Sequence, residues 1–313
     1  MKKLLFSATF TLLGIAIISI PNFVSYIDTG SFYFDLAKFL KDYPGFTYPF
    51  GALFIIFGSV YFASIIIELR REKTVFVIQK ADEEDYGDID LHFPKHVIGS
   101  KDELVYENNI SLNNYDSGII GLEKKKIMHF YKRIEPKKKI AFLAISPMPT
   151  LVYAGYVVAN SGREVVFYHW DRDKTKAVRL KRFGSMENLK ENRVVNSSSN
   201  EYVLCISTSY LINENLVLKQ FNGCNIKFYK LENPNYNAVK TQSNVRCIAN
   251  YVREQIAKLP HGSHVHLLLS CSSELCFAIG QTLNSQVLTN IRVYNLGKNE
   301  NNENCWNWSI DLN

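Results

Sequence analysis

The stretch HVHLLLSCSSELCFAIGQTLN, residues 264–284, decides the fold of this 313-residue chain. Its apolar first part, residues 264–269, predicts a β-strand. The polar turn that follows, residues 270–274, contains residue types that cap helices, and residues 275–283 predict a helix. A second strand is predicted at residues 291–296 (IRVYNL), so this part of the chain reads strand, helix, strand. Such an order is typical of an α/β domain with a parallel sheet.

The same order occurs earlier in the chain, at an offset of about 124 residues. Residues 140–146 (IAFLAIS) are continuously apolar, which predicts a strand buried on both faces, as in a parallel sheet. The proline-containing segment 147–150 opens a predicted helix that ends near residues 160–162, and residues 164–170 (EVVFYHW) predict the next strand. At this offset, Ser146 aligns with Ser270, Leu151 with Leu275, Tyr153 with Phe277, and Ala154 with Ala278. Two copies of one α/β half-domain are the simplest account.

Other segments add elements to this domain. Short β-branched or apolar runs predict strands at residues 74–79, 202–208 and 226–231, and apolar residues at helical spacing predict a helix at residues 245–259. The predicted fold class is therefore α/β, with two fused Rossmann-like halves and mostly parallel sheets.

Two long segments near the N-terminus, residues 4–27 and 47–67, carry no charged residue. Each exceeds the roughly 20 residues that a helix needs to cross a bilayer, so we predict a transmembrane hairpin at residues 1–69, with helices at about 4–24 and 47–67. A secretory signal is the alternative for the first segment, but no small-residue cleavage site follows it. A cytoplasmic linker region with short strands is predicted at residues 70–124, and the α/β domain at residues 125–313.

Basic residues flank the two uncharged segments. Lys2 and Lys3 precede the first, and Arg70, Arg71 and Lys73 follow the second. By the positive-inside rule, both ends of the hairpin, and therefore both chain termini, are expected on the cytoplasmic side.

A second basic cluster lies farther along the chain, where residues 124–139 contain eight Lys or Arg. An exposed helix followed by a turn is the simpler interpretation, because runs of charge are usually solvated. Contact with anionic headgroups or with a phosphodiester ligand is the alternative.

Motifs of common enzyme classes are absent from the sequence. There is no nucleophile elbow, P-loop, zinc-protease helix or dinucleotide-binding glycine motif. The six cysteines form no CxxC pair, and the histidines of residues 261–266 (HGSHVH) have no Cys or carboxylate nearby to complete a metal site. We therefore predict no catalytic residue, no metal and no cofactor, and we do not expect an enzyme.

Open parallel sheets bind ligands at the carboxyl ends of their strands, beside helix N-termini that suit phosphate groups. At those ends the sequence places hydroxyls that can hold phosphates, aromatic rings that can stack on bases, and one arginine. Ordinary turn and cap roles are the alternative interpretation, and Glu274 either repels a phosphate, reads a base edge or satisfies the helix dipole. The predicted ligand-binding residues are Ser146, Thr150, Trp170, Arg172, Ser207, Ser270, Ser272, Ser273 and Tyr294.

The segments quoted above resemble a known family. Residues 264–284 followed by residues 291–296, with Phe277-Ala278-Ile279-Gly280-Gln281 inside the helix, resemble the C-terminal half of a SAVED domain. The likeness covers roughly residues 125–313. It implies two fused CARF-like halves and a receptor for a cyclic di- or trinucleotide second messenger in CBASS, a bacterial antiphage system. A SAVED domain behind two transmembrane helices is an effector arrangement in that system, which places the chain in the bacterial inner membrane.

A mechanism follows from this arrangement. A domain made of two halves has two unlike ends, so it can stack head to tail into an open homo-oligomer. We expect the cyclic oligonucleotide to favour stacking, and stacking to cluster the hairpins until the lipid bilayer leaks. DNA is not expected as a partner. The alternative is a membrane-anchored adaptor or sensor whose CARF-like pair binds or slowly cleaves a nucleotide without disrupting the membrane.

Overall fold

The computed structural model describes residues 47–72, 74–81, 103–108, 117–135, 139–159, 161–171, 176–184, 187–283, 290–299 and 301–312. The chain divides into two compact units, Met1–Glu72 and Lys73–Asn313. In the first unit the described element is helix α3 (Thr47–Glu72), which contains the helix predicted at 47–67, whereas the helix predicted at 4–24 lies outside the described residues. Among the described residues, no helix combines the length and apolarity that crossing a membrane requires.

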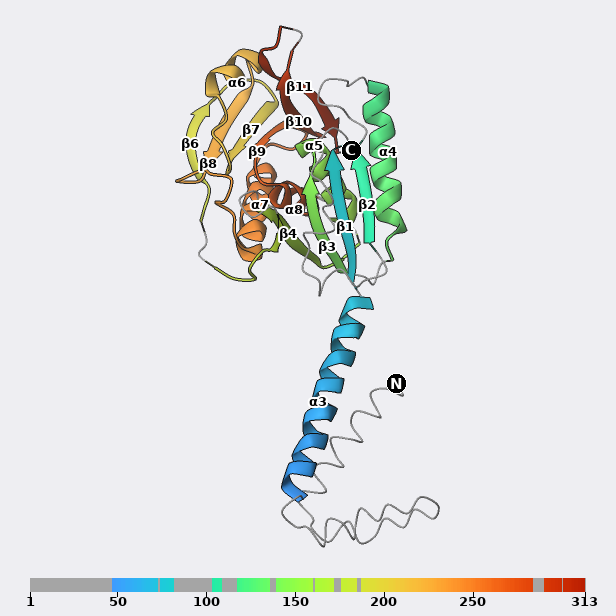
Figure 1. Cartoon of the computed structure of the whole chain (residues 1–313). Coiled ribbons are helices and arrows are strands. Elements are labelled where there is room, and N and C mark those ends of the chain that lie inside the picture. The colour runs from blue at the N-terminus through green and yellow to red at the C-terminus, as the bar shows by residue number, and fades with distance from the viewer. Residues whose placement is uncertain are drawn as a thin grey trace. The chain divides into compact units, whose positions relative to one another are not determined.

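The second unit is built on two β-sheets (Figure 1). Among the described residues, one sheet has five strands in the order β2-β1-β3-β4-β5, and the other has six in the order β11-β10-β9-β7-β8-β6. The first consists of β1 (Thr74–Ala81), β2 (Glu103–Asn108), β3 (Lys139–Ile145), β4 (Val165–Asp171) and β5 (Lys176–Arg179). The second consists of β6 (Lys190–Val195), β7 (Glu201–Ser207), β8 (Asn225–Lys230), β9 (His264–Ser270), β10 (Asn290–Lys298) and β11 (Asn304–Asp311).

Strand β3 forms the centre of the first sheet, as its continuous apolar sequence predicts. It pairs in parallel with β1 on one side and β4 on the other. Ile140 and Phe142 face the main core, while Ala141 and Leu143 face a smaller cluster on the opposite side of the sheet. Both sets are buried because successive side chains of a strand point to opposite faces.

Region 70–124 contributes to this sheet and does not act only as a linker. Its strands β1 and β2 pair with each other in parallel, and β1 lies between β2 and β3. Val75 and Val77 of β1 are buried in the same core as Phe142. The short apolar run of β1 is therefore part of the α/β domain, whose compact unit begins at Lys73.

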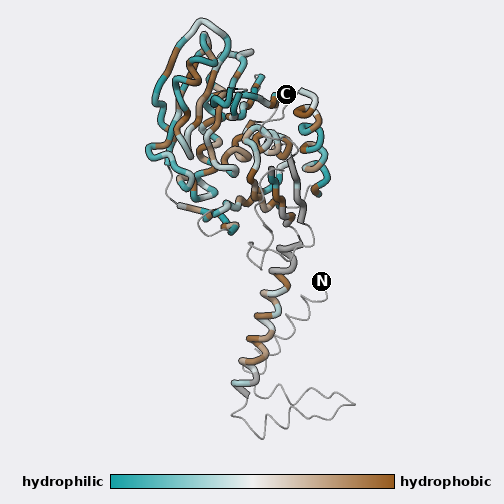
Figure 2. The backbone as a smooth tube through the Cα atoms, turned by 45° about the horizontal axis from the view of Figure 1, so that its top comes forward, coloured by the Kyte–Doolittle hydropathy of each residue, from teal (hydrophilic) through white to brown (hydrophobic). Residues whose placement is uncertain are grey.

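Parallel strands form the interior of the second sheet and antiparallel strands form its edges. Strands β7, β8, β9 and β10 pair in parallel, which confirms the prediction of mostly parallel sheets. Strands β6 and β11 add antiparallel edges, as β5 does in the first sheet. In Figure 2 hydrophobic residues gather in the interior of the second unit and hydrophilic residues along its outer loops. Edge strand β6 is mostly exposed, which is why its sequence signal is weak.

Helices pack between and around the sheets. They are α4 (Ser117–Arg133), α5 (Met148–Ala159), α6 (Glu214–Gln220), α7 (Gln242–Ala257) and α8 (Ser273–Thr282). Helix α5 contacts β10 and β11 of the second sheet, while α8 contacts β3 and β4 of the first. The two central helices therefore share one apolar core with both sheets.

The basic segment 124–139 begins within α4, which buries Ile127 and Tyr131 and packs against α5. Lys124 donates a hydrogen bond to the backbone carbonyl of Asp311 at 2.6 Å, and Lys139 forms an ion pair with Glu164. This part of the basic cluster is an amphipathic helix with its own partners.

The two halves of the domain repeat at 125 residues, one more than the sequence alignment predicts. Lys139 and His264 begin equivalent strands, Met148 and Ser273 begin equivalent helices, and Val165 and Asn290 begin the strands that follow. The predicted offset of 124 paired residues of similar type, such as Ser146 with Ser270 and Leu151 with Leu275. These pairs are one position out of register with the structural repeat, because residues of the same type lie one position apart in the two halves.

Gly155 and Gly280 confirm the 125-residue register. A Cβ at position 155 in α5 would overlap the carbonyl oxygen of Phe277 in α8, and a Cβ at position 280 in α8 would overlap the carbonyl oxygen of Val152 in α5. Gly155 and Gly280 are equivalent positions of the repeat, and so are Val152 and Phe277. Each helix therefore uses the same face to contact the other. Only glycine allows the two backbones this close approach.

Candidate functional site

A cavity of about 680 Å³ lies where the two halves meet, at the carboxyl ends of their strands. Its volume falls within the range of about 300–1,000 Å³ that is usual for small-molecule sites. Its lining comes from the ends of β3 and β4, the first turns of α5 and α8, and the loops after β7 and β8. The lining residues are Ala144, Ile145, Ser146, Met148, Leu151, His169, Trp170, Ser209, Tyr210, Tyr236, Cys271, Ser272, Ser273 and Glu274.

Equivalent positions of the repeat line this one cavity. Ser146 and Cys271 follow the two central strands, and Met148 and Ser273 begin the two central helices. The close contact between α5 and α8 brings both strand-to-helix junctions to the same place. The cavity is therefore a shared site of the two halves.

A chain of hydrogen bonds holds the first junction. Thr150 donates its hydroxyl hydrogen to the carbonyl of Pro147 at 2.7 Å, so Ser146 is the donor in its 3.2 Å contact with the Thr150 hydroxyl. The Thr150 hydroxyl also accepts from Nε2 of Gln79 at 3.5 Å, and the hydroxyl of Tyr131 donates to Oε1 of Gln79 at 3.0 Å. Strand β1 and helix α4 thus support the turn that carries Ser146.

The second junction holds the loop that follows β7. The carbonyl of Ser270 accepts hydrogen bonds from the backbone amides of Thr208 and Ser209, both at 2.9 Å, and its hydroxyl accepts from the amide of Tyr210 at 3.2 Å. The hydroxyl of Ser207 accepts from the amide of Ile212 at 3.2 Å. These bonds fix the loop so that Tyr210 lies at the cavity.

A buried carboxyl and a histidine meet across the cavity. Glu274, in the first turn of α8, is only 3% exposed, and its Oε1 lies 3.1 Å from Nδ1 of His169 on β4. The hydrogen bond to Glu274 raises the pKa of His169, although burial of the ring acts in the opposite direction, and the negative charge of Asp171 adds to the rise. His169 therefore carries positive charge over a wider pH range than an exposed histidine.

Four of the predicted ligand-binding residues lie together in this cavity, namely Ser146, Trp170, Ser272 and Ser273. Thr150, Ser207 and Ser270 do not line it, because their hydroxyls are engaged in the bonds that shape its walls. Arg172 lies outside the described residues.

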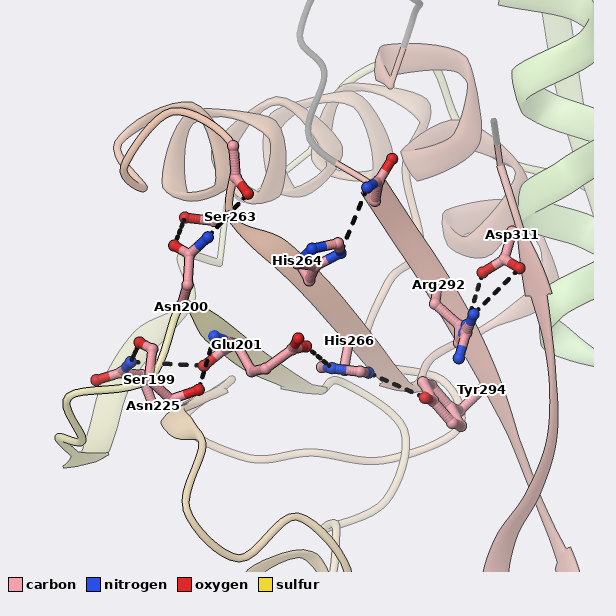
Figure 3. Close-up of polar contacts among 12 residues, drawn as sticks. Ser199, Asn200, Glu201, Asn225, Ser263, His264, His266, Arg292, Tyr294 and Asp311 are labelled. Atoms are coloured by element: carbon pink, nitrogen blue, oxygen red, sulfur yellow. Dashed lines mark hydrogen bonds and ion pairs between the residues drawn. The ribbon is translucent and has the colours of Figure 1, made fainter.

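Tyr294 is predicted at the site but lies on the other face of the second sheet. Its neighbour Val293 faces the main core, whereas the Tyr294 ring packs with Phe221 beside α6. Its hydroxyl lies 2.9 Å from Nδ1 of His266, and Nε2 of His266 lies 2.6 Å from Oε2 of Glu201. Figure 3 shows these three side chains in a row across the sheet. The alternation of side chains along β10 explains why a residue near the strand end does not reach the cavity.

The predicted set of ligand-binding residues leaves out several residues that line the cavity, among them Glu274, for which the sequence leaves three roles open. His169 and Glu274 are 105 positions apart, and only the tertiary structure brings them into contact. Tyr210 and Tyr236 lie on loops after β7 and β8, where no periodic pattern marks them. The sequence marks these two tyrosines only by their position after parallel strands, because ligands of open parallel sheets bind among the loops at the carboxyl ends of the strands.

Comparison with known proteins agrees with this architecture. The family model of the SMODS-associated and fused to various effectors sensor domain, SAVED, matches residues 123–312. No curated protein sequence matches the chain.

Two solved structures of the Acinetobacter baumannii Cap4 SAVED/CARF-domain containing receptor share the fold. The structure with the cyclic trinucleotide 2'3'3'-cAAA aligns with a TM-score of 0.51 and 12% identity over 89% of this chain. The structure with 3'3'3'-cAAA aligns with a TM-score of 0.50 and 13% identity over 86% of this chain. This chain spans 62% of the length of each of these chains, less than two thirds. The family match covers more than half of the chain, and the chain therefore belongs to the SAVED family.

Proposed function

We propose that this protein is a receptor for a cyclic oligonucleotide second messenger and that the ligand binds in the cavity shared by the two halves. The observation that carries the proposal is the composition and position of this cavity. Two helix N-termini open into it, and Trp170, Tyr210 and Tyr236 supply aromatic rings on which bases can stack. Backbone amides at helix N-termini suit phosphates, so a ligand with both bases and phosphates matches the lining.

Membership of the SAVED family and the two Cap4 structures support this class of ligand. Those structures contain cyclic trinucleotides of adenine, and they share the fold of this chain at low sequence identity. The ligand of this chain is therefore proposed at the level of a cyclic di- or trinucleotide, with 2'3'3'-cAAA and 3'3'3'-cAAA as the first candidates to test.

We further propose that the protein is a CBASS effector of the bacterial inner membrane, with both termini cytoplasmic. The support is the pair of uncharged segments 4–27 and 47–67 and the basic residues that flank them. In the described part of α3, Leu53, Ile56, Phe57 and Val60 are exposed. In this proposal the receptor acts through assembly, without catalysis.

The receptor proposal is tested by binding measurements on the full-length chain in detergent. Isothermal titration with a panel of cyclic di- and trinucleotides, including both forms of cAAA, should identify at least one tight ligand that is recovered intact. Recovery of a cleaved product would favour the enzymatic alternative. No binding to any cyclic oligonucleotide in the panel would contradict the receptor proposal.

Acidic substitutions at the second junction should abolish binding. The double variant Ser272→Glu/Ser273→Glu adds two bulkier, negatively charged side chains to the lining of the cavity that is proposed to hold an anionic ligand, so we expect affinity to fall by about 100-fold or more. Folding should persist, because Ser272 makes no side-chain capping bond and acidic residues are favourable in a first helical turn. Ser198→Glu, on an exposed loop, is the matched control. Affinity that stays the same in the double variant would place the ligand outside this cavity.

Membrane disruption should require the ligand. We expect the full-length chain in dye-loaded liposomes to release dye only when a binding cyclic oligonucleotide is added. The size of the protein in light scattering should rise under the same conditions, because head-to-tail stacking produces an open oligomer. Leakage without a change in size would favour a constitutive oligomer in which the ligand only reorients the hairpins.

A further inference from the structure

The carboxyl group of Glu274 has one oxygen without a hydrogen-bond partner in the described part of the chain. Oε1 contacts His169, but Oε2 is buried and accepts no hydrogen bond there. The side chain is 97% buried, and the residue lines the cavity. A buried acceptor without a donor is costly, so a donor supplied by a ligand would gain a strong hydrogen bond.

The charges around Glu274 restrict what that donor can be. The described lining of the cavity contains no Lys or Arg, and His169 is the one residue of the lining that can carry positive charge near neutral pH. A carboxylate oxygen accepts hydrogen bonds and does not donate them, and two negative groups repel each other, so a phosphate is a poor partner for Oε2. A ligand group that binds Oε2 must therefore be an N–H or O–H donor without negative charge.

A second unpartnered atom belongs to Ser272, which lies two positions before Glu274 and also lines the cavity. The hydroxyl oxygen of Ser272 is buried and has no hydrogen-bond partner among the described residues, although Ser272 is the N-cap residue of α8. A hydroxyl can donate to an acceptor as well as accept. The start of α8 thus carries an acceptor, the carboxyl of Glu274, and a donor, the hydroxyl of Ser272.

Adenine and cytosine present the complementary pair on their Watson–Crick edge, an amino group beside a ring nitrogen that accepts. We propose that Glu274 reads the ligand's base by accepting a hydrogen bond from its exocyclic amino group, while Ser272 donates to the adjacent ring nitrogen. This proposal rests on the proposed function, and it makes Glu274 a specificity-determining residue. Trp170 in the same lining offers the stacking surface for that base.

Pairs of cyclic trinucleotides whose bases differ at the exocyclic amino group test this proposal on the unmodified full-length chain. The probes are 3'3'3'-cAAA against the same ring with purine lacking the 6-amino group, and the 3'3'3'-linked cyclic trinucleotides of cytosine and uracil. In any pair that binds, we expect the member with the amino group to bind about 10- to 100-fold more tightly, the range expected for one base-edge contact. Equal affinity within a binding pair would overturn the reading by Glu274 and leave the receptor proposal standing. Failure of a full panel of cyclic di- and trinucleotides to bind would overturn both.

Variants then connect the preference to this carboxyl. Glu274→Met keeps the approximate length of the side chain and removes both acceptor oxygens, and we expect the affinity ratio within each binding pair to fall to about threefold or less. Glu254→Met, on the exposed surface of α7, should leave the ratio unchanged. A ratio in Glu274→Met equal to that of the wild-type chain, with a normal thermal unfolding transition, would assign base reading to another residue.

Discussion

Replacement of Gly280 by alanine should destabilise the α/β domain by about 3 kcal/mol or more, and Gly155→Ala should have a similar effect. In each case the new methyl group would overlap a backbone carbonyl oxygen of the opposing helix, at Val152 for position 280 and at Phe277 for position 155. Backbone atoms cannot rotate away as a side chain can, so α5 and α8 must separate and the shared core must open. Both helices also begin at the cavity, and ligand binding should weaken together with stability.

Thermal unfolding of the full-length chain measures this effect. A loss of 3 kcal/mol corresponds to a fall of roughly 6–12 °C in the midpoint for a domain of this size. Gly121→Ala is the matched control, because position 121 lies in helix α4 and no atom lies within 4 Å of the added methyl group. That variant should be neutral or more stable by up to about 1 kcal/mol, since alanine favours helix more than glycine does. A midpoint for Gly280→Ala equal to that of the wild-type chain would refute the close contact.

Removal of β1 and β2 should prevent the domain from folding. A fragment of residues 117–313 keeps α4 and the whole family match, yet it lacks β1, which pairs with one edge of β3. Val75, Val77 and Ile78 are at most 2% exposed, and burial of each contributes about 1.5–3 kcal/mol. Their combined loss is comparable with the whole stability of a typical domain, about 5–15 kcal/mol. The open edge of β3 would also be prone to aggregation.

The matched fragment is residues 73–313, which contains the complete second unit. We expect this fragment to show a cooperative unfolding transition, and the 117–313 fragment to be insoluble or to lack one. Circular dichroism during heating distinguishes the two results. A cooperative transition in the shorter fragment would mean that β1 and β2 are additions to a self-sufficient domain.

The central elements of both halves could be predicted from the sequence. Strand β3 is a continuous apolar run, and β9 ends at a polar turn with helix-capping residues. In both halves the pattern lies within about 30 consecutive residues, so strand, helix and strand are visible without knowledge of the partners. The edge strand β6 was not predicted, because a strand that faces solvent is not marked by an apolar run.

Some of the residues that line the candidate cavity were also predicted from the sequence. Ser146, Trp170, Ser272 and Ser273 follow or begin elements with clear signals, and the rule that ligands bind at the carboxyl ends of parallel strands places them correctly at the cavity. The rule does not tell which of these end residues turn their side chains into the cavity. Tyr294 faces away because the pleat of β10 directs it to the opposite side of the sheet.

The sequence by itself determined the class of fold, the repeat of two α/β halves and the edge of the sheets at which the cavity lies. These features depend on hydrophobic periodicity and turn residues, which act over a few neighbouring positions. The tertiary structure alone decided the 125-residue register, the inclusion of β1 in the first sheet and the contact between His169 and Glu274. Each of these depends on packing between segments far apart in the chain, where the fit of two backbones or the contact of a carboxyl with an imidazole leaves no periodic pattern in the local sequence.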